Sequence, residues 1–529
     1  MKELTLMRNL TASMAGGASI RQTSSMLRMR GQDGLNRYVD MKQRVSSSLS
    51  RAVSTLTKDA GDISSVFPSL SGKPADPLPP RFSALKKLLI RGNEDAICAS
   101  WQRLVSSLEI EIDEIAHRGS EVGGNNIPRL SVSTTHWSVL QVIPSIEYHD
   151  VVSGTIPPRQ LETVRHRGAA VIRNLLPRQQ ALDLKSQAQE YVAANGPKVK
   201  AFPADDPAVY ELYWTPSQVQ ARAHPNVLQT QSFLASLWHS SDPTSEISTR
   251  YPLTYADRFR IRRPGDAKFA LGPHTDGGSL ERWEDSEYSR VYQAILRGRW
   301  EDYDPFDAKH RIAAHMDLYN GAGACSMFRL FQGWLSMSST RPGEGTLKVY
   351  PLLKHATAYL ILRPFFDLHS GHLHLDPTFP NSVPGACQEY NPRTHPDLRL
   401  ETAMVSVPHV EPGDYVAWHC DTIHAVDREH RGIGDSSVLY IPACAMTLSN
   451  LDFLRRQRLS ALRYSPPPDF PAAGGDGELG FQGVVNWERD VNEEGKRAMG
   501  LGTRTWEVKE GMSEGERKVV EEGNRMLFA

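Results

Sequence analysis

The segment that decides the fold runs from Glu411 to Asp427 and reads EPGDYVAWHCDTIHAVD. Its opening Pro-Gly-Asp is typical of a tight turn, because proline fixes φ and glycine reaches conformations that other residues avoid. The apolar residues that follow predict a short strand. His419 and His424 come near the end of this strand, and either could face inward. The segment therefore predicts a strand that carries a histidine to a site.

Short strand-like runs, separated by glycine and proline, fill the region around this segment. The expected strands are 258–262, 268–271, 327–335, 346–350, 358–362, 403–407, 414–419 and 437–444. Many short strands without alternating helices favour an antiparallel barrel or jelly roll over a doubly wound parallel sheet. We therefore expect an α+β fold with a jelly-roll core and flanking helices.

Helical and linker patterns divide the rest of the chain. Residues 1–80 are rich in Ser, Thr and Pro, and we expect them to be weakly structured. Residues 81–142 carry apolar residues at helical spacing, which predicts a helical cap on a main domain of residues 143–460. Residues 461–529 are expected to return to loop and helix.

Local signals locate several elements more closely. Residues 169–172 are a short β-rich run, and Pro177 then opens a helix, since proline is tolerated in a first turn. Another helix is expected at 227–238. Near the C-terminus, Ser513 is typical of a helix N-cap, with Glu516 three residues later.

The charge balance and composition exclude several classes of function. The 529 residues include 60 Lys and Arg against 61 Asp and Glu, which disfavours a nucleic-acid-binding protein. Hydrophobic residues make up 40% of the chain, and no apolar run approaches the ~20 residues of a membrane-spanning helix. We therefore expect a globular protein with neither nucleic acid nor membrane as a partner.

Cysteine usage bears on the cellular compartment. The five cysteines are scattered without a CxxC pair, so neither a disulfide framework nor a structural zinc site is expected. This favours a reducing, cytoplasmic location. The basic N-terminus, with Arg21, Arg28 and Arg30 among its charges, resembles a mitochondrial transit peptide, although an ordinary basic tail has the same composition and is favoured.

His-x-Asp at the end of a strand is a second chemical signal. Side chains at i and i+2 of a strand share a face, so both can reach one ion. With a distant histidine they form the two-histidine, one-carboxylate triad of non-haem iron enzymes. With 18 histidines, composition alone gives about one such pair, and this chain has more. The pairs are His274/Asp276, His315/Asp317, His374/Asp376, His395/Asp397 and His419/Asp421.

The local context favours His274 and Asp276. An apolar run precedes the pair, and Gly277-Gly278 turns the chain directly after it, so backbone and substrate can come close. By contrast, 395–397 lies in a Pro-containing loop that we expect to be exposed. The pair at 315–317 lies in a stretch, 309–319, that we expect to be helical, and side chains at i and i+2 of a helix diverge.

The two favoured segments resemble Fe(II)/2-oxoglutarate-dependent oxygenases. Gly413-Asp414, an apolar strand and then WHCDTIHAV resemble the C-terminal half of that superfamily. Residues 272–283, GPHTDGGSLERW, resemble a microbial branch of it, and residues 167–177, RGAAVIRNLLP, resemble the opening strand and helix of the phytanoyl-hydroxylase-like group. The resemblance covers roughly residues 143–460.

This resemblance implies a double-stranded β-helix with His274, Asp276 and His424 as ligands of Fe(II). His424 is preferred to His419 because it directly precedes Ala-Val. The implied reaction consumes O2 and 2-oxoglutarate, releases succinate and CO2, and oxidises, most simply by hydroxylation, a small-molecule substrate. A carboxylate at Asp276, rather than Gly or Ala, favours hydroxylation over halogenation.

The anchor for the co-substrate departs from the family pattern. A buried dicarboxylate needs a paired cation, and arginine meets a carboxylate through two parallel N–H donors. Related enzymes usually place this arginine ten or more residues past the far histidine, where this chain has Gly434 and Val438. The candidate co-substrate residues are Arg428 and Arg431 near that histidine, Arg258 and Arg260 on one face of an earlier strand, and Thr346 as a hydrogen-bonding group.

Two other classes of function stay open on the sequence. One is a metal-dependent barrel with non-oxidative chemistry that uses His369, His372 and His374. The other is a degenerate barrel that only binds a ligand or partner. An intact triad argues against the binding module, and the missing arginine argues for it.

Overall fold

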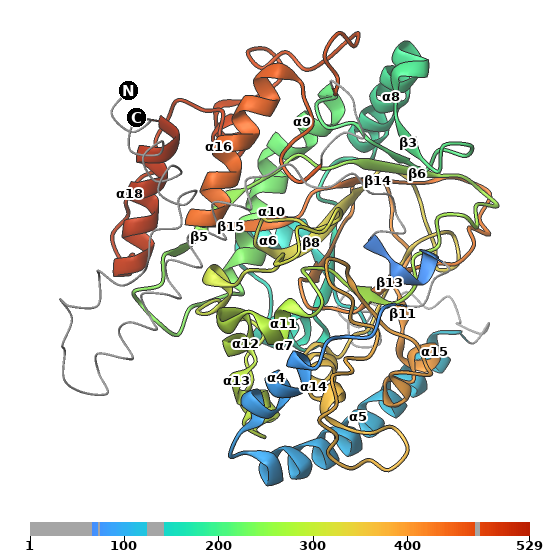
Figure 1. Ribbon diagram of the computed structural model, residues 1–529. Coiled ribbons are helices and arrows are strands. Elements are labelled where there is room, and N and C mark those ends of the chain that lie inside the picture. The colour runs from blue at the N-terminus through green and yellow to red at the C-terminus, as the bar shows by residue number, and fades with distance from the viewer. Residues whose placement is uncertain (1–65, 72–74, 124–141, 471–476, 529) are drawn as a thin grey trace, which may run out of the picture. The chain divides into compact units, whose positions relative to one another are not determined.

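The segment 411–427 contributes strands to two different sheets of the computed structural model (Figure 1). The structure describes residues 66–71, 75–123, 142–470 and 477–528. After the turn, β12 (Tyr415–His419) lies in the larger sheet, and β13 (His424–Val426) lies in the smaller one. The chain therefore passes from one sheet to the other between its two candidate histidines.

The larger sheet runs in the order β1-β2-β12-β8-β14-β6-β4-β3, with β15 joined to β8 and β5 joined to β15. Its strands besides β12 are β1 (Ser145–Glu147), β2 (Ala169–Arg173), β3 (Ala201–Phe202), β4 (Val209–Tyr210), β5 (Ile247–Leu253), β6 (Phe259–Arg262), β8 (Arg329–Ser336), β14 (Ser436–Tyr440) and β15 (Ala443–Thr447). Only β1 and β2 pair in parallel among these described strands. The expectation of an antiparallel β-structure is therefore confirmed at this level.

The smaller sheet runs in the order β10-β7-β13-β9-β11 and is antiparallel. Its strands besides β13 are β7 (His274–Thr275), β9 (Leu347–Val349), β10 (Gln388–Glu389) and β11 (Val405–Ser406). One apolar cluster joins Trp334 and Val416 of the larger sheet to Leu347 and Val349 of the smaller sheet. The two sheets therefore pack face to face.

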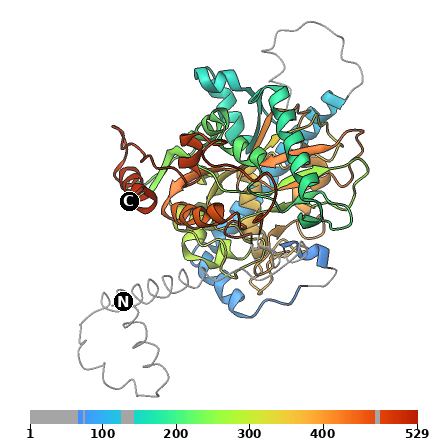
Figure 2. The same ribbon diagram turned by 90° about the horizontal axis from the view of Figure 1, so that it is seen from above.

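Helices cover the outer face of the larger sheet (Figures 1 and 2). They are α6 (Tyr148–Ser153), α7 (Pro158–Arg167), α8 (Arg178–Asn195), α9 (Pro216–Ala223) and α10 (Pro225–Ser236). Leu184 and Leu234 of these helices share a buried cluster with Phe259 and Leu335 of the sheet. The helices predicted after Pro177 and around 227–238 are confirmed as α8 and α10.

A second group of helices packs next to the smaller sheet. Its helices are α4 (Arg81–Ile90), α5 (Glu94–Gly123), α11 (Glu281–Glu284), α12 (Ser286–Val291), α13 (Gln293–Leu296), α14 (Leu353–Leu362) and α15 (Leu400–Ala403). They share one apolar cluster, in which α5 packs along α14 and α15. Helical spacing after residue 81 therefore predicted α4 and α5 correctly.

Some predicted elements are wrong. Residues 358–362 belong to α14 and not to a strand, because an apolar run buried on every side has no alternation that separates strand from helix. Residues 268–271 form a loop, since the Asp266 carboxylate accepts from the N–H of Lys268 at 2.8 Å and bends the chain there. Residues 309–319 contain only the 3-10 turn Arg311–Ala313.

The C-terminal helices pack on the edge of the larger sheet. They are α16 (Leu448–Arg463), α17 (Glu493–Ala498) and α18 (Glu514–Phe528). Figure 1 shows α16 and α18 side by side next to β5 and β15, and an apolar cluster joins these elements. The Ser513 hydroxyl accepts from the N–H of Glu516 at 3.1 Å, which confirms the predicted N-cap.

The chain divides into two units, residues 1–57 and 58–529, and every described residue lies in the second. The transit-peptide alternative therefore falls outside the described residues. Among the described helices, none is both long and apolar enough to cross a bilayer. Short 3-10 turns lie at Pro68–Ser71, Gly196–Lys198, Trp300–Asp302, Arg363–Phe365 and Pro396–Leu398.

Candidate metal centre

His274 and His424 are brought together by strand pairing. His274 opens β7, His424 opens β13, and these two residues face each other in the antiparallel ladder. Their imidazole rings lie with centroids 4.2 Å apart. The register of the smaller sheet thus places two histidines, 150 positions apart in the numbering, on one spot.

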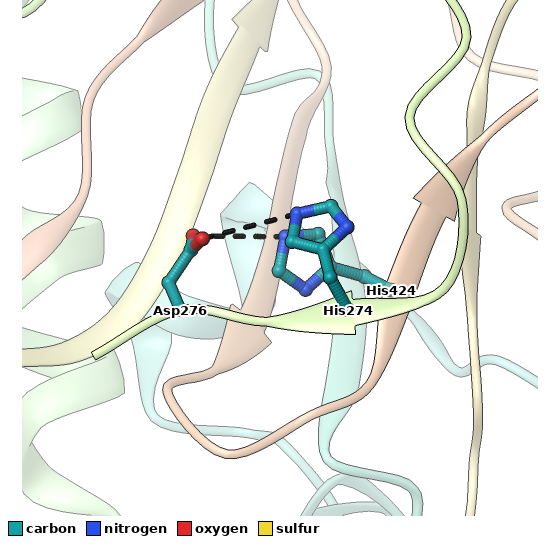
Figure 3. Close-up of side chains that lie close together, drawn as sticks. All are labelled: His274, Asp276 and His424. Atoms are coloured by element: carbon teal, nitrogen blue, oxygen red, sulfur yellow. Dashed lines mark ion pairs between the residues drawn. The ribbon is translucent and has the colours of Figure 1, made fainter. Parts of the chain in front are cut away.

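Asp276 completes a group of three possible metal ligands (Figure 3). One carboxylate oxygen lies 3.8 Å from Nε2 of His274, and the other lies 3.7 Å from Nε2 of His424. These separations are too long for hydrogen bonds. They are close to the roughly 3–4 Å between ligand atoms that share one ion through bonds of about 2 Å.

Backbone carbonyls fix the orientation of both imidazoles. Nδ1 of His274 lies 2.7 Å from the carbonyl oxygen of Gly272, and Nδ1 of His424 lies 3.0 Å from that of Thr422. A carbonyl oxygen only accepts, so each Nδ1 must donate. The lone pair is then on Nε2 of each ring, directed toward Asp276, which is the arrangement of a metal-binding histidine.

The protonation states suit a cation. Burial lowers the pKa of His424 to about 3, so this imidazole is neutral at physiological pH. Burial alone would raise the pKa of Asp276, but the nearby His424 and His274 outweigh it, and the pKa lies below its usual value. The site therefore offers the neutral imidazole of His424 and the ionised carboxylate of Asp276.

The loop after Asp276 is held in a conformation that requires glycine. Gly278 has φ of +86°, and a Cβ atom there would lie 2.6 Å from the carbonyl oxygen of Met316. Arg282 is buried and donates to the carbonyl oxygens of Asp276, at 2.7 Å, and of Gly278. Arg282 thus positions the loop.

The three side chains open onto a cavity of about 480 Å³. Its wall combines aromatic rings, among them Trp334, Trp418 and Phe269, with three arginines. The arginines are Arg258, Arg260 and Arg329. A small-molecule site of this size fits the cavities that bind drug-sized ligands.

The predicted co-substrate residues fall into two groups. Arg258 and Arg260 line the cavity with the triad. Arg428 and Arg431 are exposed and lie outside it, and Arg431 pairs with Glu429 at 3.3 Å. Thr346 is buried, but it does not line the cavity. Arg428, Arg431 and Thr346 therefore lie apart from the wall of the cavity that holds the triad.

Arg260 differs from Arg258 in having no carboxylate partner. Arg260 is 3% exposed, and its Nη2 makes only long contacts, 3.3 Å to the Ser436 hydroxyl and 3.4 Å to the Gly345 carbonyl oxygen. Its Nε has no hydrogen-bond partner. Arg258 is partly exposed and pairs with Asp257 at 3.4 Å. A buried guanidinium without an anion is costly, so Arg260 is suited to bind one.

Other polar groups of the cavity also lack partners. Nε2 of Gln332 and Nε1 of Trp418 are buried without a hydrogen-bond acceptor among the described residues, and both side chains line the cavity. Buried donors without acceptors are rare in folded proteins. They are expected where a ligand supplies the acceptor.

Sequence reasoning missed two contributors to the cavity. Arg329 begins β8, and its signal in the sequence is a single charge in an otherwise apolar strand. Phe67 comes from far upstream and packs edge-on against His274, with centroids 4.8 Å apart. No sequence pattern links a residue before the linker to this site, so Phe67 could not be found in that way.

A family model matches residues 76–501 of the chain, and its description is Gig2-like. The chain belongs to the Gig2-like family. Uncharacterised protein YbiU of Escherichia coli K12 is 35% identical over 371 residues, 68% of this chain and 86% of YbiU.

Two solved structures extend this relationship. The GlcNAc-inducible Gig2 protein of Candida albicans has a TM-score of 0.75 and 33% identity, over 86% of this chain and 96% of its own. A protein of Salmonella typhimurium LT2, provisionally named an oxidoreductase, has a TM-score of 0.68 and 31% identity, over 80% of this chain and 99% of its own.

His419, Cys420 and Asp421 form a second group of possible ligands in this Gig2-like chain. Both ring nitrogens of His419 are already used, Nε2 by the Pro305 carbonyl oxygen at 3.0 Å and Nδ1 by the N–H of Asp421 at 3.1 Å. Asp421 pairs with Arg311 at 2.5 Å. This group is a satisfied buried network and leaves His424 as the histidine that faces the cavity.

The alternative cluster at His369, His372 and His374 is not assembled. All three histidines are exposed, and no group of possible metal ligands in the described part of this Gig2-like chain includes them. The 395–397 loop also differs from expectation, because His395 is buried, with its ring against Tyr390 at 5.0 Å between centroids.

Proposed function

We propose that this Gig2-like protein is an Fe(II)- and 2-oxoglutarate-dependent oxygenase that hydroxylates a small molecule. The observation that carries the proposal is a triad of His274, Asp276 and His424 on the wall of a cavity that also holds the guanidinium of Arg260, which forms no ion pair among the described residues. Such a triad leaves positions open on a metal, and the guanidinium calls for a carboxylate.

We infer that the two sheets are the halves of a double-stranded β-helix. Along the chain, β6, β8, β12 and β14 fall in the larger sheet, while β7, β9, β11 and β13 fall in the smaller one. The chain passes between the facing sheets at nearly every step, as in jelly rolls of eight strands. This winding supports the inference, because it places β7 and β13, the two histidine strands, side by side.

The chemistry of the donor set fits Fe(II). His274, Asp276 and His424 would hold the ion. Together with 2-oxoglutarate, the bound ion would activate O2 for the oxidation of a C–H bond, with succinate and CO2 as the other products. The chain's own part is orientation. The carbonyl oxygens of Gly272 and Thr422 hold the rings, and fixed ligands avoid reorganisation when a metal binds.

The cavity also fits a dicarboxylate co-substrate. Arg260 would bind the carboxylate that lies away from the metal, and Gln332 and Trp418 would donate to its oxygens. Aromatic walls and the ring of Phe67 exclude water from the neighbourhood of the triad. A dry site strengthens each of these polar contacts and protects a reactive site from hydrolysis.

Anaerobic titration of the purified protein with Fe(II) and 2-oxoglutarate tests the proposal. We expect a weak visible metal-to-ligand charge-transfer band in the unaltered protein, and its loss in His274→Ala and in Asp276→Ala. His369→Ala is the matched control, since that histidine is exposed and outside the group. On admission of oxygen, succinate should form in the unaltered protein and in His369→Ala, but not in the two triad variants.

Absence of the band from folded protein that has taken up iron would overturn the co-substrate assignment and favour a metal barrel of non-oxidative chemistry. Failure to take up iron at all would favour a barrel that only binds a ligand. The two results can be distinguished from each other, because the iron content is measured on the same sample as the band.

A further inference from the structure

A second arginine in the cavity also has no carboxylate partner. Arg329 lines the wall near the triad, and it forms no ion pair among the described residues. The groups that act on its guanidinium include the hydroxyl of Tyr255 and the carboxylate of Asp276. Arg258, by contrast, is already neutralised by Asp257. Neither Arg260 nor Arg329 therefore forms an ion pair with a carboxylate of the described residues.

The two arginines stand at different ends of the larger sheet. Arg260 on β6 lies in register with Val438 of β14, which in turn faces Ser336 at the end of β8. Arg329 is at the other end of β8. Seven residues of strand correspond to roughly 20 Å along the sheet. Arg260 and Arg329 therefore come from two separate stretches of the cavity wall.

An irregularity in the sheet turns Arg329 toward the cavity. The register of β15 against β8 shifts between Ala443, which faces Phe331, and Cys444, which faces Arg329. Leu330 and Phe331 both belong to the cluster on the outer face. The shift breaks the alternation of the strand and leaves Arg329 inside, where bulges are known to re-aim side chains next to active sites.

Among the described residues, no acid that lines the cavity forms an ion pair with Arg329. Asp257 pairs with Arg258, the Glu281 carboxylate accepts from the N–H of Ser279 at 2.7 Å, and Asp469 accepts from Ser326. Glu211 and Asp317 also line the wall, and neither is paired with Arg329. Asp276 is committed to the histidines. The missing anion must therefore come from a ligand.

We propose that the substrate of this enzyme is a carboxylic acid whose carboxylate binds the guanidinium of Arg329. The proposal rests on the proposed function, since it assigns Arg260 to the co-substrate and the second cation to the substrate. The two parallel N–H donors of one guanidinium match the two oxygens of a carboxylate, whereas a phosphate dianion needs more donors. Tyr213, Phe470 and Phe67 on the same wall suit an apolar or aromatic body.

Calorimetric titration of the protein loaded with Fe(II) and 2-oxoglutarate without oxygen tests this inference. The probes are phenylacetate and hexanoate, with phenylacetamide as the neutral match of the first and inorganic phosphate as the other anion. We expect at least one of the two acids to bind, phenylacetamide to bind at least tenfold more weakly than phenylacetate, and phosphate not to bind.

Substitutions separate substrate from co-substrate. In Arg329→Gln the affinity for the acid should fall at least tenfold while the Kd for 2-oxoglutarate stays within twofold, and Arg329→Lys should retain part of the affinity. Arg428→Gln, at an exposed arginine outside the cavity, should change neither. Thermal unfolding of each variant checks that it is folded.

Four results would overturn the inference. They are equal binding of acid and amide, no binding of either acid, binding of phosphate in place of both acids, and a loss of 2-oxoglutarate binding in Arg329→Gln, which would make Arg329 the co-substrate anchor. Failure of the proposed function would give a different result, because the charge-transfer band would then be missing from the unaltered protein. In that case, titration of the acids into protein without Fe(II) and 2-oxoglutarate would still test Arg329.

Discussion

At the scale of single residues, the different surroundings of Arg258 and Arg260 separate two arginines that the sequence placed together. We predict that Arg260→Gln raises the Kd for 2-oxoglutarate by roughly 10- to 100-fold, because a charged hydrogen bond contributes about 1.5–3 kcal/mol. Iron binding should be unchanged, since Arg260 is not part of the triad. The charge-transfer band, titrated against 2-oxoglutarate, measures the first quantity, and metal analysis measures the second.

Arg258→Gln is the matched control for that prediction. Arg258 pairs with Asp257 and is partly exposed, so its loss should change the Kd for 2-oxoglutarate by less than threefold. A larger effect at Arg258 than at Arg260 would exchange their roles. A substantial loss of iron in Arg260→Gln would instead mean that the substitution disturbs the whole wall.

His419 and His424 could not be distinguished as metal ligands from their positions in the sequence. The sequence placed both near a strand end, and only the neighbours in space distinguish them. His419 stacks on Trp238, with centroids 4.7 Å apart, and both its nitrogens are occupied. His424 has a free Nε2 that faces Asp276. Hydrogen-bond partners from distant segments determine which histidine is available to a metal, and a local sequence pattern does not reveal those partners.

At the scale of elements, local patterns predicted strands with a clear period and failed where burial is complete. The alternation in 258–262 correctly predicted β6, and the cap at Ser513 correctly predicted the start of α18. The run 358–362 has no period, because α14 is buried all around. Arg329 was missed for the related reason that a register shift, and not alternation, sets its direction.

The segment before the first long helix covers the triad, and this gives a prediction for Phe67. Its ring is 5% exposed and packs against His274, and the carbonyl oxygen of Val66 accepts from the N–H of Cys387 at 3.1 Å. We predict that Phe67→Ala speeds the loss of Fe(II) to a chelator at least threefold, because the substitution opens a path for water. A chelator chase followed by absorbance measures the rate.

Leu70→Ala controls for a change elsewhere in the same segment. Leu70 is 48% exposed, so its truncation should leave the chelation rate unchanged. Equal rates in the unaltered protein and in Phe67→Ala would show that the ring does not limit access to the triad. Faster loss in both variants would point to the whole segment, whose Ser69 binds the Glu389 carboxylate.

At the scale of the whole molecule, an antiparallel β-structure with a metal site was predictable because segments 272–283 and 411–427 both indicated strands that carry possible metal ligands. The two segments predicted strands that bring His274 and His424 to one site, and β7 and β13 do so as neighbours in the smaller sheet. The cavity's charge pattern was not predictable, since it joins β6, β8 and a segment before residue 70. Long-range register determines such a pattern, and single-sequence periodicity carries no register.

Buried neutral histidines make the whole fold sensitive to acid. Burial lowers the pKa of His395 and of His419 to about 3, and that of His355 to about 4. An unfolded histidine has a pKa near 6.5, so below that pH the unfolded chain binds more protons than the folded one. Stability from these groups is complete above about pH 6.5 and is lost progressively as the pH falls toward 3.

We therefore predict that the free energy of unfolding of metal-free protein falls between pH 6.5 and 4.5, by as much as roughly 2 kcal/mol for each such histidine. In His395→Gln the fall should be smaller, because one of the groups that must take up a proton on unfolding is gone. Urea denaturation at several pH values measures the slope. His369→Gln, at an exposed loop position, controls for the substitution itself. A slope in His395→Gln as steep as in the unaltered protein would mean that His395 does not stay neutral in the folded state.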